Sequence, residues 1–390
     1  MQRVLIEGWR GVSHSFALVN QCQILEMLKR PQLQLFHRDL PFAFAHWNKA
    51  GHDAGFSDAE QQQIAALGEP DDGPLDWIYR ISSPFKAGPT PACPVLTFMV
   101  TELGLSAGSF NTDGRGLEAY TEGDNLIVTP TQWSRDRIVE YGFSPDKVKV
   151  VPHGVRADTF QPLAPADRTL VRHNLGYQDD EVVFLNLGVS TWNKGIDLVL
   201  LAFATVKRAG HKVRLILKDQ RNLYGISVDQ VLKEVSSSRP DLFDEATLQA
   251  ISVVSVNLNQ AGLRQLYGIA DAYVSPYRAE GFNLPVLEAA ACGTPVIVTQ
   301  GGATDDFCNA DVAMLIPSQP GARELAPGQV VPARYHEPDL GQLVEAMDAC
   351  ARGQGLDPAR RERGRQALVA RMNWASATQA LLDLAETAHA

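Results

Sequence analysis

Residues 272–304 read AYVSPYRAEGFNLPVLEAAACGTPVIVTQGGAT and hold the clearest alternation of elements in the chain. The apolar run 272–275 predicts a strand, and the loop after it contains Glu280 and Gly281. Pro285 suits the first turn of a helix, and the run 296–299 predicts the next strand. A strand, a helix and a strand in this order form a βαβ unit, so we expect parallel strands.

The loop and helix of this stretch combine groups that suit a polar ligand. Open parallel sheets bind ligands at the carboxyl ends of their strands, and backbone N–H groups at a helix N-terminus, here Phe282, Asn283 and Leu284, attract anions. Glu280 precedes the helix and Glu288 lies inside it, so both carboxylates can accept from hydroxyl groups of one ligand. The alternative is a loop carboxylate and a solvated helix carboxylate. The apolar run directly after Glu288 makes an idle surface position less expected.

The same alternation extends over the whole chain. The chain has 390 residues, and a single core rarely grows past about 250–300, so we expect two domains. A Pro-rich linker near 160–167 separates two α/β halves, which gives domains 1–165 and 166–371. Residues 319–332 are rich in Gly and Pro and predict a surface loop. The further strands are predicted at 77–81, 95–100, 126–129, 148–151, 182–187, 213–217 and 251–256.

Composition excludes several classes of protein. The net charge is −10, and each side of residue 165 carries −5, so neither half forms a nucleic-acid-binding surface. The 5 cysteines follow no CxxC pattern, which favours reduced thiols in the cytoplasm over a zinc site or a disulfide framework. The start of the chain does not fit a signal peptide, and the longest uncharged stretch, 289–304, is broken by Gly and Pro.

The run from Glu280 to Ile297 resembles the signature of the retaining glycosyltransferases of family 4. Segments 125–162, 187–201 and 266–276 resemble further parts of that family in the same order, whereas 35–76 matches least. The resemblance implies a GT-B fold, which has two facing Rossmann-like domains with parallel sheets. It also implies that the C-terminal helix, 372–390, crosses back to the first domain.

The resemblance assigns roles to individual residues. Glu288 would bind the ribose hydroxyls of a nucleotide, Glu280 the donor sugar near its reacting carbon, and Lys194 the diphosphate. A lysine at a helix start is unfavourable against the helix dipole, which itself favours a functional role for Lys194 over a plain surface position. The backbone at Phe282, Asn283 and Leu284 would hold sugar and phosphate. Gly11 would let backbone approach the phosphates, and the loop around Val256 would face the nucleobase.

The sequence also departs from that family. Gly188 is followed by Val189, where an arginine that binds phosphate is usual. Lys218 is the expected substitute, ahead of Arg221, with a solvated strand-end lysine as the alternative. Where a histidine is common in the first domain, the chain has Thr101 and Glu102. Weaker candidates on the acceptor side are His14, Arg10 and Arg80, each of which is also compatible with a structural role.

The expected function is therefore transfer of a sugar from a nucleotide sugar to an acceptor hydroxyl with retention of configuration. The nucleotide is UDP or GDP, and the acceptor is a glycan or a lipid-linked or protein-linked molecule in polysaccharide or glycan biosynthesis. No cofactor and no metal are expected, since the adjacent pairs Asp71-Asp72 and Asp179-Asp180 fit solvated loops. The location is the cytoplasm, with weak peripheral association at the inner membrane left open. The alternatives are a non-catalytic sugar-nucleotide binder or partner subunit, and a GT-B epimerase.

Overall fold

The computed structural model describes residues 1–47, 55–88, 92–324 and 331–389. The chain divides into two compact units. The first unit comprises residues 1–154, 323–333 and 372–390, and the second comprises 155–322 and 334–371. The expected division into domains 1–165 and 166–371 stays a prediction.

The first unit contains a parallel sheet of six strands in the order β2-β1-β3-β5-β7-β8. The order of strand addition changes side between β1 and β3, because β2 pairs with one side of β1 and all later strands of the sheet lie on the other. A parallel pair, β4 (Phe85–Lys86) and β6 (Phe110–Asn111), lies apart from this sheet. The strands are β1 (Gln2–Gly8), β2 (Leu33–Asp39), β3 (Trp77–Ile81), β5 (Val95–Phe98), β7 (Leu126–Thr129) and β8 (Val148–Val150).

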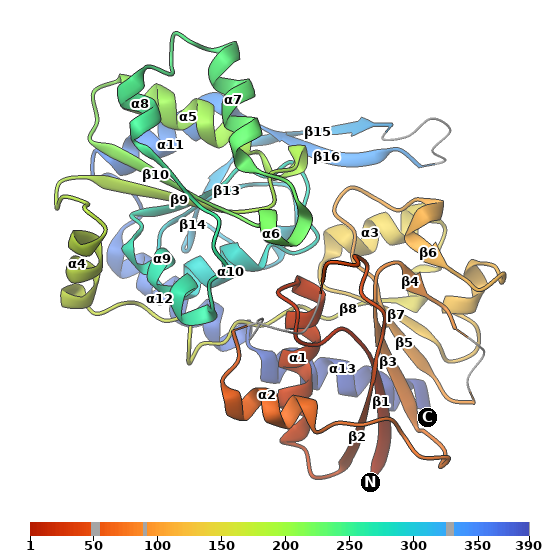
Figure 1. The fold of residues 1–390 in the computed structure, drawn as a ribbon. Coiled ribbons are helices and arrows are strands. Elements are labelled where there is room, and N and C mark those ends of the chain that lie inside the picture. The colour runs from red at the N-terminus through yellow and green to blue at the C-terminus, as the bar shows by residue number, and fades with distance from the viewer. Residues whose placement is uncertain (48–54, 89–91, 325–330, 390) are drawn as a thin grey trace. The chain divides into compact units, whose positions relative to one another are not determined.

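Four α-helices of the described residues belong to this unit: α1 (Ser15–Leu28), α2 (Asp58–Ala65), α3 (Gln132–Tyr141) and α13 (Trp374–His389). The helix α13 comes from the end of the chain and packs against α1 (Figure 1). Its first residue, Trp374, lies with its ring centroid 5.7 Å from that of His153. A side chain at Gly154 would collide with the backbone of Trp374 at 2.2 Å, so this approach requires glycine. The predicted return of the C-terminal helix to the first domain is confirmed.

The second unit contains another parallel sheet of six strands, in the order β11-β10-β9-β12-β13-β14. Its core is built from apolar side chains such as Phe184, Phe203 and Leu215, which are fully buried. The strands are β9 (Val182–Gly188), β10 (Val213–Asp219), β11 (Ile251–Val254), β12 (Ala272–Ser275), β13 (Val296–Thr299) and β14 (Ala313–Ile316).

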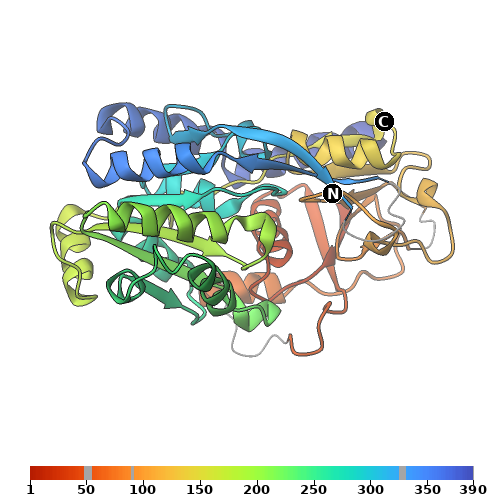
Figure 2. The ribbon, with the colours of Figure 1, turned by 90° about the horizontal axis from the view of Figure 1, so that it is seen from above.

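Helices cover both faces of this second sheet. On one face α5 contacts α7, α8 and α11, and on the other α9 and α10 contact α4 and α12 (Figure 1). The view from above shows α5 and α11 side by side (Figure 2). The helices are α4 (Pro165–Asn174), α5 (Ile196–Arg208), α6 (Arg221–Tyr224), α7 (Val228–Ser238), α8 (Glu245–Gln249), α9 (Gln260–Ile269), α10 (Leu284–Ala291), α11 (Leu340–Ala351) and α12 (Pro358–Arg371).

The predicted loop at 319–332 is wrong over its first residues. The structure places a strand there, β15 (Ser318–Arg323), which pairs with β16 (Ala333–Pro338) in a two-stranded sheet. Residues 325–330 of the predicted loop lie outside the described residues. Gly321 packs against the ring of Tyr335, where a Cβ would lie 2.4 Å from that ring, so a glycine that suggested a loop serves close packing between two strands. In the described part of the chain, no helix is long and apolar enough to span a membrane.

Candidate functional site

The candidate site lies at the carboxyl ends of β9 and β12 in the second unit. These strands are neighbours, with Phe184 opposite Ala272 and Leu185 opposite Tyr273. The order of strand addition changes side here, because β10 pairs with one side of β9 and β12 with the other. At such a point the connections that follow the two strands run to opposite faces of the sheet, which leaves room for a ligand between them. The loops 189–194 and 276–283 both begin at this edge of the sheet.

Lys194 and Glu280, which the sequence assigned to the same ligand, form an ion pair in the structure. The Lys194 Nζ lies 2.8 Å from the Glu280 Oε2, and the two side chains are 16% and 13% exposed. The backbones of the two loops are joined as well, since the Asn193 carbonyl accepts from the N–H groups of Arg278 at 2.7 Å and Ala279 at 3.2 Å. A cation and a carboxylate are therefore held together at the edge of the sheet, still partly open to water.

Two helices begin beside this pair, and special backbone conformations precede both. Gly195 has φ of +69°, and a Cβ there would lie 2.0 Å from the carbonyl oxygen of Pro276, so only glycine fits before α5. Asn283 has φ of 76° before α10 and donates through Nδ2 to the Ser275 Oγ at 3.0 Å. Among the described residues, no capping side chain accepts from the first N–H groups of α5 or α10. Uncapped N-termini of this kind attract anions.

Glu288 lies inside α10 and is only 8% exposed, which rules out the solvated helix carboxylate. The hydroxyl of Tyr267, itself fully buried on α9, donates to the Glu288 Oε2 at 2.8 Å. Burial raises the pKa of Glu288 from 4.5 to about 7, and the bond from Tyr267 partly counteracts this effect. A buried carboxylate with one oxygen already bonded is poised to accept from a ligand hydroxyl through the other. Sequence reasoning missed Tyr267, although it lies within segment 266–276.

Lys218 lies at the end of β10, opposite Leu187 in the β9 ladder and thus next to the loop after Gly188. Its side chain is buried, and Nζ donates to the carbonyl of Asp219 at 2.5 Å. Burial lowers the pKa of Lys218, and the neighbouring Asp219 partly offsets the decrease. Arg221 contacts the carboxylates of Asp219 at 2.7 Å and Asp229 at 2.8 Å. The geometry therefore keeps Lys218 ahead of Arg221 as the substitute for an arginine at Val189, which stays a prediction.

The remaining donor-side residues lie on the same edge of the sheet. Phe282 is buried and stacks on Phe307, with ring centroids 4.9 Å apart. Leu284 starts α10 and is also buried. Val256 follows β11 and is 62% exposed, which is unusual for valine and leaves it available to a flat ligand. Its contact with a nucleobase stays a prediction.

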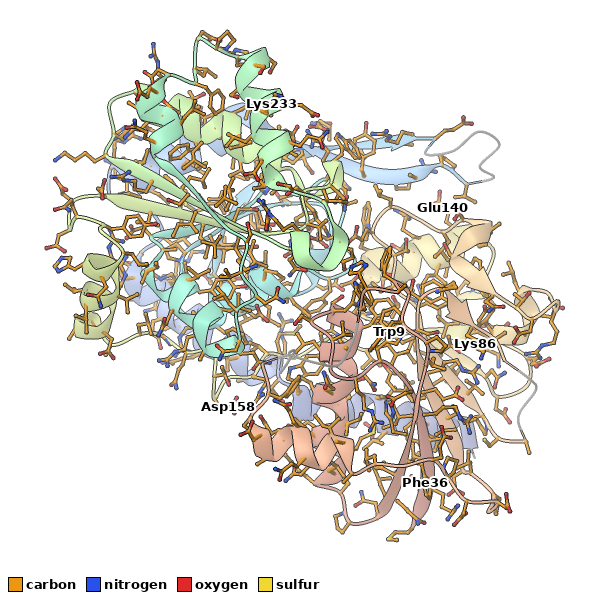
Figure 3. All side chains as sticks on the ribbon, in the orientation of Figure 1. Trp9, Phe36, Lys86, Glu140, Asp158 and Lys233 are labelled. Atoms are coloured by element: carbon orange, nitrogen blue, oxygen red, sulfur yellow. The ribbon has the colours of Figure 1, made fainter. Side chains whose placement is uncertain are left out.

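In the first unit, the loop after β1 holds Gly11 and His14. Gly11 has φ of +70°, and its N–H donates to the Gln21 Oε1 at 3.2 Å. His14 caps α1, since its Nδ1 accepts from the N–H of Phe16 at 3.0 Å. Its ring also packs against Trp9 (labelled in Figure 3), and burial lowers its pKa to about 4. His14 is therefore neutral near pH 7, and a ligand role for it stays a prediction.

Arg10 and Arg80, proposed as cations for an acidic acceptor, are engaged in internal contacts. Both guanidinium nitrogens Nε and Nη2 of Arg10 donate to Asp39 at 2.9 Å, and Nη1 donates to the carbonyl of Ile64 at 2.7 Å. Arg80 is buried, with Nε 2.5 Å from the Glu7 Oε2. These contacts tie β1 to β2 and β3, and a structural role fits both arginines better than contact with an acceptor.

The last acceptor-side candidates lie just beyond β5. The Thr101 Oγ1 donates to the carbonyl of Gly104 at 2.6 Å and accepts from its N–H at 2.9 Å, so the hydroxyl closes a turn. Glu102 is half-buried, and its carbonyl accepts from the Trp133 Nε1 at 2.7 Å. The structure thus gives Thr101 a local partner, and contact of Glu102 with a sugar hydroxyl stays a prediction. Within the described ranges, no three His, Cys, Asp or Glu side chains gather closely enough to hold a metal ion.

Comparisons with known proteins agree with this architecture. A glycosyltransferase from Rickettsia africae has a similar fold, with a TM-score of 0.69, 15% identity, and coverage of 99% of this chain and 98% of that chain. The Anabaena protein HepE, crystallised with UDP-glucose, gives a TM-score of 0.66 at 15% identity and 99% coverage of both chains. These likenesses define a GT-B fold built from two Rossmann-like units.

Sequence comparison relates part of the chain to a known family. Residues 167–326 match the family described as Glycosyl transferases group 1. The D-inositol 3-phosphate glycosyltransferase of Segniliparus rotundus is 28% identical over 267 residues, which are 63% of this chain and 57% of that protein. The mannosylfructose-phosphate synthase of Agrobacterium fabrum is 26% identical over 46% of this chain and 38% of that protein. The chain spans about half the length of the curated relatives it matches. Residues 167–326 are therefore similar to glycosyl transferases group 1, and the relatives found by sequence are glycosyltransferases of comparable identity.

Proposed function

We propose that this protein is a retaining glycosyltransferase that moves a sugar from a nucleotide sugar to an acceptor hydroxyl. The observation that carries the proposal is the Lys194–Glu280 pair, 2.8 Å apart, at the start of two uncapped helices. Glu288, buried on the second of these helices, completes the set. A cation, two helix N-termini and two carboxylates match the phosphates and hydroxyls of a nucleotide sugar.

The charges of this site fit the chemistry of sugar transfer. The bond between the anomeric carbon and the phosphate oxygen breaks, and the leaving nucleoside diphosphate gains negative charge. Lys194 and the N-termini of α5 and α10 stabilise that charge as it develops. The acceptor oxygen forms its bond to the anomeric carbon on the same face, and its proton passes to the leaving phosphate. Glu280 holds the sugar hydroxyls, and Lys218 supplies a second cation in place of an arginine at Val189.

The proposal extends to the donor nucleotide, the acceptor and the domain that binds each of them. The donor is a UDP sugar or a GDP sugar, and UDP-glucose is the first to test, because HepE, a protein of the same fold, was crystallised with UDP-glucose. Residues 166–371 would form the donor domain, and residues 1–165 with the helix 372–390 would form the acceptor domain. The acceptor is a glycan or a lipid-linked or protein-linked molecule in glycan or polysaccharide biosynthesis. The reaction would need no metal and would take place in the cytoplasm, and peripheral association with the inner membrane surface stays open.

One observation favours a second candidate, a non-catalytic sugar-nucleotide binder or partner subunit. Val189 stands where the family usually has an arginine for phosphate, and its side chain carries no charge. Such a protein would retain the hydroxyl-binding carboxylates Glu280 and Glu288 but would not stabilise the leaving group. Binding without turnover would identify it.

A thermal-shift screen of nucleotides and nucleotide sugars tests binding, because a ligand of the native state raises its melting temperature. Turnover of the best ligand is then compared between the wild type and Glu280→Ala. We expect loss of transfer in the variant with the fold intact, while Glu345→Ala, at an exposed position of α11, keeps full turnover. Absence of any shift with nucleotides would contradict the proposal, and a shift without turnover would support the second candidate.

A further inference from the structure

Arg278 lies between β12 and Glu280, and its guanidinium connects three separate segments of the second unit. The side chain is 5% exposed. Its Nη1 and Nη2 donate to the two oxygens of Asp197, both at 2.8 Å, in the first turn of α5. Nη1 also donates to the carbonyl of Trp192 at 2.9 Å, and Nε donates to Glu337 on β16 at 2.8 Å. The fork geometry of arginine makes such simultaneous contacts possible, whereas the ammonium of lysine cannot reproduce them.

The backbone of Arg278 takes part in the same connection. Its N–H donates to the carbonyl of Asn193 at 2.7 Å, and its carbonyl accepts from the N–H of His336 at 2.8 Å. The Asn193 side chain returns a bond, since Nδ2 donates to the carbonyl of Ala279 at 3.0 Å. The residues bonded in this way directly precede Lys194 on one loop and Glu280 on the other. Their separation is therefore set by contacts that converge on Arg278.

We infer that Arg278 is a positioning residue, which sets the placement of Lys194 against Glu280 for the nucleotide sugar. The inference rests on the proposed function. In the absence of ligand, Lys194 pairs with Glu280, and a bound diphosphate must draw the ammonium toward its own oxygens. The bidentate contact to Asp197 and the bond to the Trp192 carbonyl keep the loop of Lys194 in place during this exchange. Glu337 on β16 accepts from the Nε on the opposite side of the guanidinium, so β16 helps to hold the Arg278 side chain in place.

The arrangement differs from that of a buried arginine that only stabilises the fold. Arg172 provides the comparison: its side chain is 3% exposed and bonds to Asp271, at the opposite end of β12. Its other partners are carbonyl groups such as that of Ile269, at 2.9 Å. These contacts of Arg172, with Asp271 and the carbonyl groups of Ile269, Gln178 and Glu181, do not involve the loops of Lys194 or Glu280. Arg172, on α4, and Arg278 are therefore two buried arginines that bond near opposite ends of β12, and Arg172 serves as the control for Arg278.

The test is a double-variant cycle that measures the affinity for UDP by calorimetry. Arg278→Lys and Lys194→Ala are made singly and together, and Arg172→Lys is the control. We expect Arg278→Lys to weaken UDP binding and to lower kcat/KM with UDP-glucose, each by roughly 10- to 100-fold, because displacement of a binding group by about 1 Å costs as much. In the Lys194→Ala background the same substitution should cost less than about 3-fold, since the group that it positions is absent.

The outcomes separate the inference from the proposed function. Equal losses in both backgrounds, or an equal loss in Arg172→Lys, would show that Arg278 acts only through stability and would overturn the inference. A wild type that binds neither UDP nor GDP overturns the proposed function together with the inference. If Arg278→Lys does not fold, Glu337→Gln repeats the cycle from the 44% exposed end of the contact. Losses that are equal with and without Lys194 would then overturn the inference.

Discussion

Replacement of Glu288 by glutamine should make the protein more stable relative to the wild type at pH 8 than at pH 5, while it weakens nucleotide binding. The side chain is 8% exposed, and burial raises its pKa from 4.5 to about 7. Between pH 4.5 and about pH 7, the folded state keeps a proton on Glu288 that the unfolded state has released. Stability therefore falls as the pH rises from about 4.5 to 7, and above pH 7 the whole penalty applies.

The size of this penalty follows from the two pKa values. A change in the pKa of a carboxyl from 4.5 to about 7 corresponds to about 3 kcal/mol. Glutamine carries no charge, so it removes the penalty, although its amide donors need acceptors that this site was not built to offer. That cost is the same at every pH. The gain at pH 8 relative to pH 5 should therefore approach ~2–3 kcal/mol, or roughly 5–10 °C in melting temperature.

The assay is thermal melting of the wild type, Glu288→Gln and the exposed control Glu345→Gln at pH 5 and pH 8. The difference between Glu288→Gln and the wild type should grow with pH, whereas Glu345→Gln should follow the wild type at both values. Calorimetry with UDP should show weaker binding to Glu288→Gln. If the difference in melting temperature is the same at pH 5 and pH 8, Glu288 is not buried as a titrating carboxyl and the reasoning is refuted.

Two further substitutions test the same edge of the sheet. Lys218→Met should leave the melting temperature at pH 7 unchanged or higher, because burial disfavours the ammonium, and should weaken UDP binding about 10- to 100-fold through loss of a charged contact. The control is Lys233→Met, at an exposed position of α7 (Figure 3). Unchanged UDP affinity in Lys218→Met would exclude Lys218 as the substitute cation. Gly195→Ala should destabilise the protein by more than about 2 kcal/mol in denaturant unfolding, because φ is +69° and the new Cβ would meet the Pro276 carbonyl at 2.0 Å. Gly210→Ala, where the structure leaves open space at a φ of +95°, should lower the free energy of unfolding by less. Equal losses of stability in the two variants would show that backbone conformation alone is responsible.

Many of the elements could be predicted from sequence, because their apolar period is local. The strands 77–81, 126–129, 272–275 and 296–299 agree with the structure at both ends. The strand 33–39 was not predicted, because it lies at the edge of the first sheet and most of its residues are only half-buried, so it lacks a continuous apolar run. Strands β15 and β16 were missed for a similar reason: paired mainly with each other, they need no continuous apolar run.

For the candidate site as well, local patterns identify residues but not their contacts. Glu280, Glu288 and Lys194 could be found because each belongs to a local pattern, a strand followed by a loop and a helix start. Their states could not be found in this way. The pKa of Glu288 depends on burial under α9 and on Tyr267, which lies 21 residues earlier in the chain. Arg10 and Arg80 appeared as available cations, and only the partners from β1, β2 and the following segments showed that both are engaged.

The order of strands and helices along the chain is enough to show which groups meet at the edge of the second sheet, because it brings successive loops to that edge. The charge and the contacts of each group follow only from the folded structure, because both depend on neighbours that are distant along the chain. Arg278 illustrates this division. It stands two residues before Glu280, yet its partners Asp197 and Glu337 lie 81 residues before it and 59 residues after it. No local pattern of residues encodes such a contact, which forms only when the parallel sheet and β16 bring the three segments together.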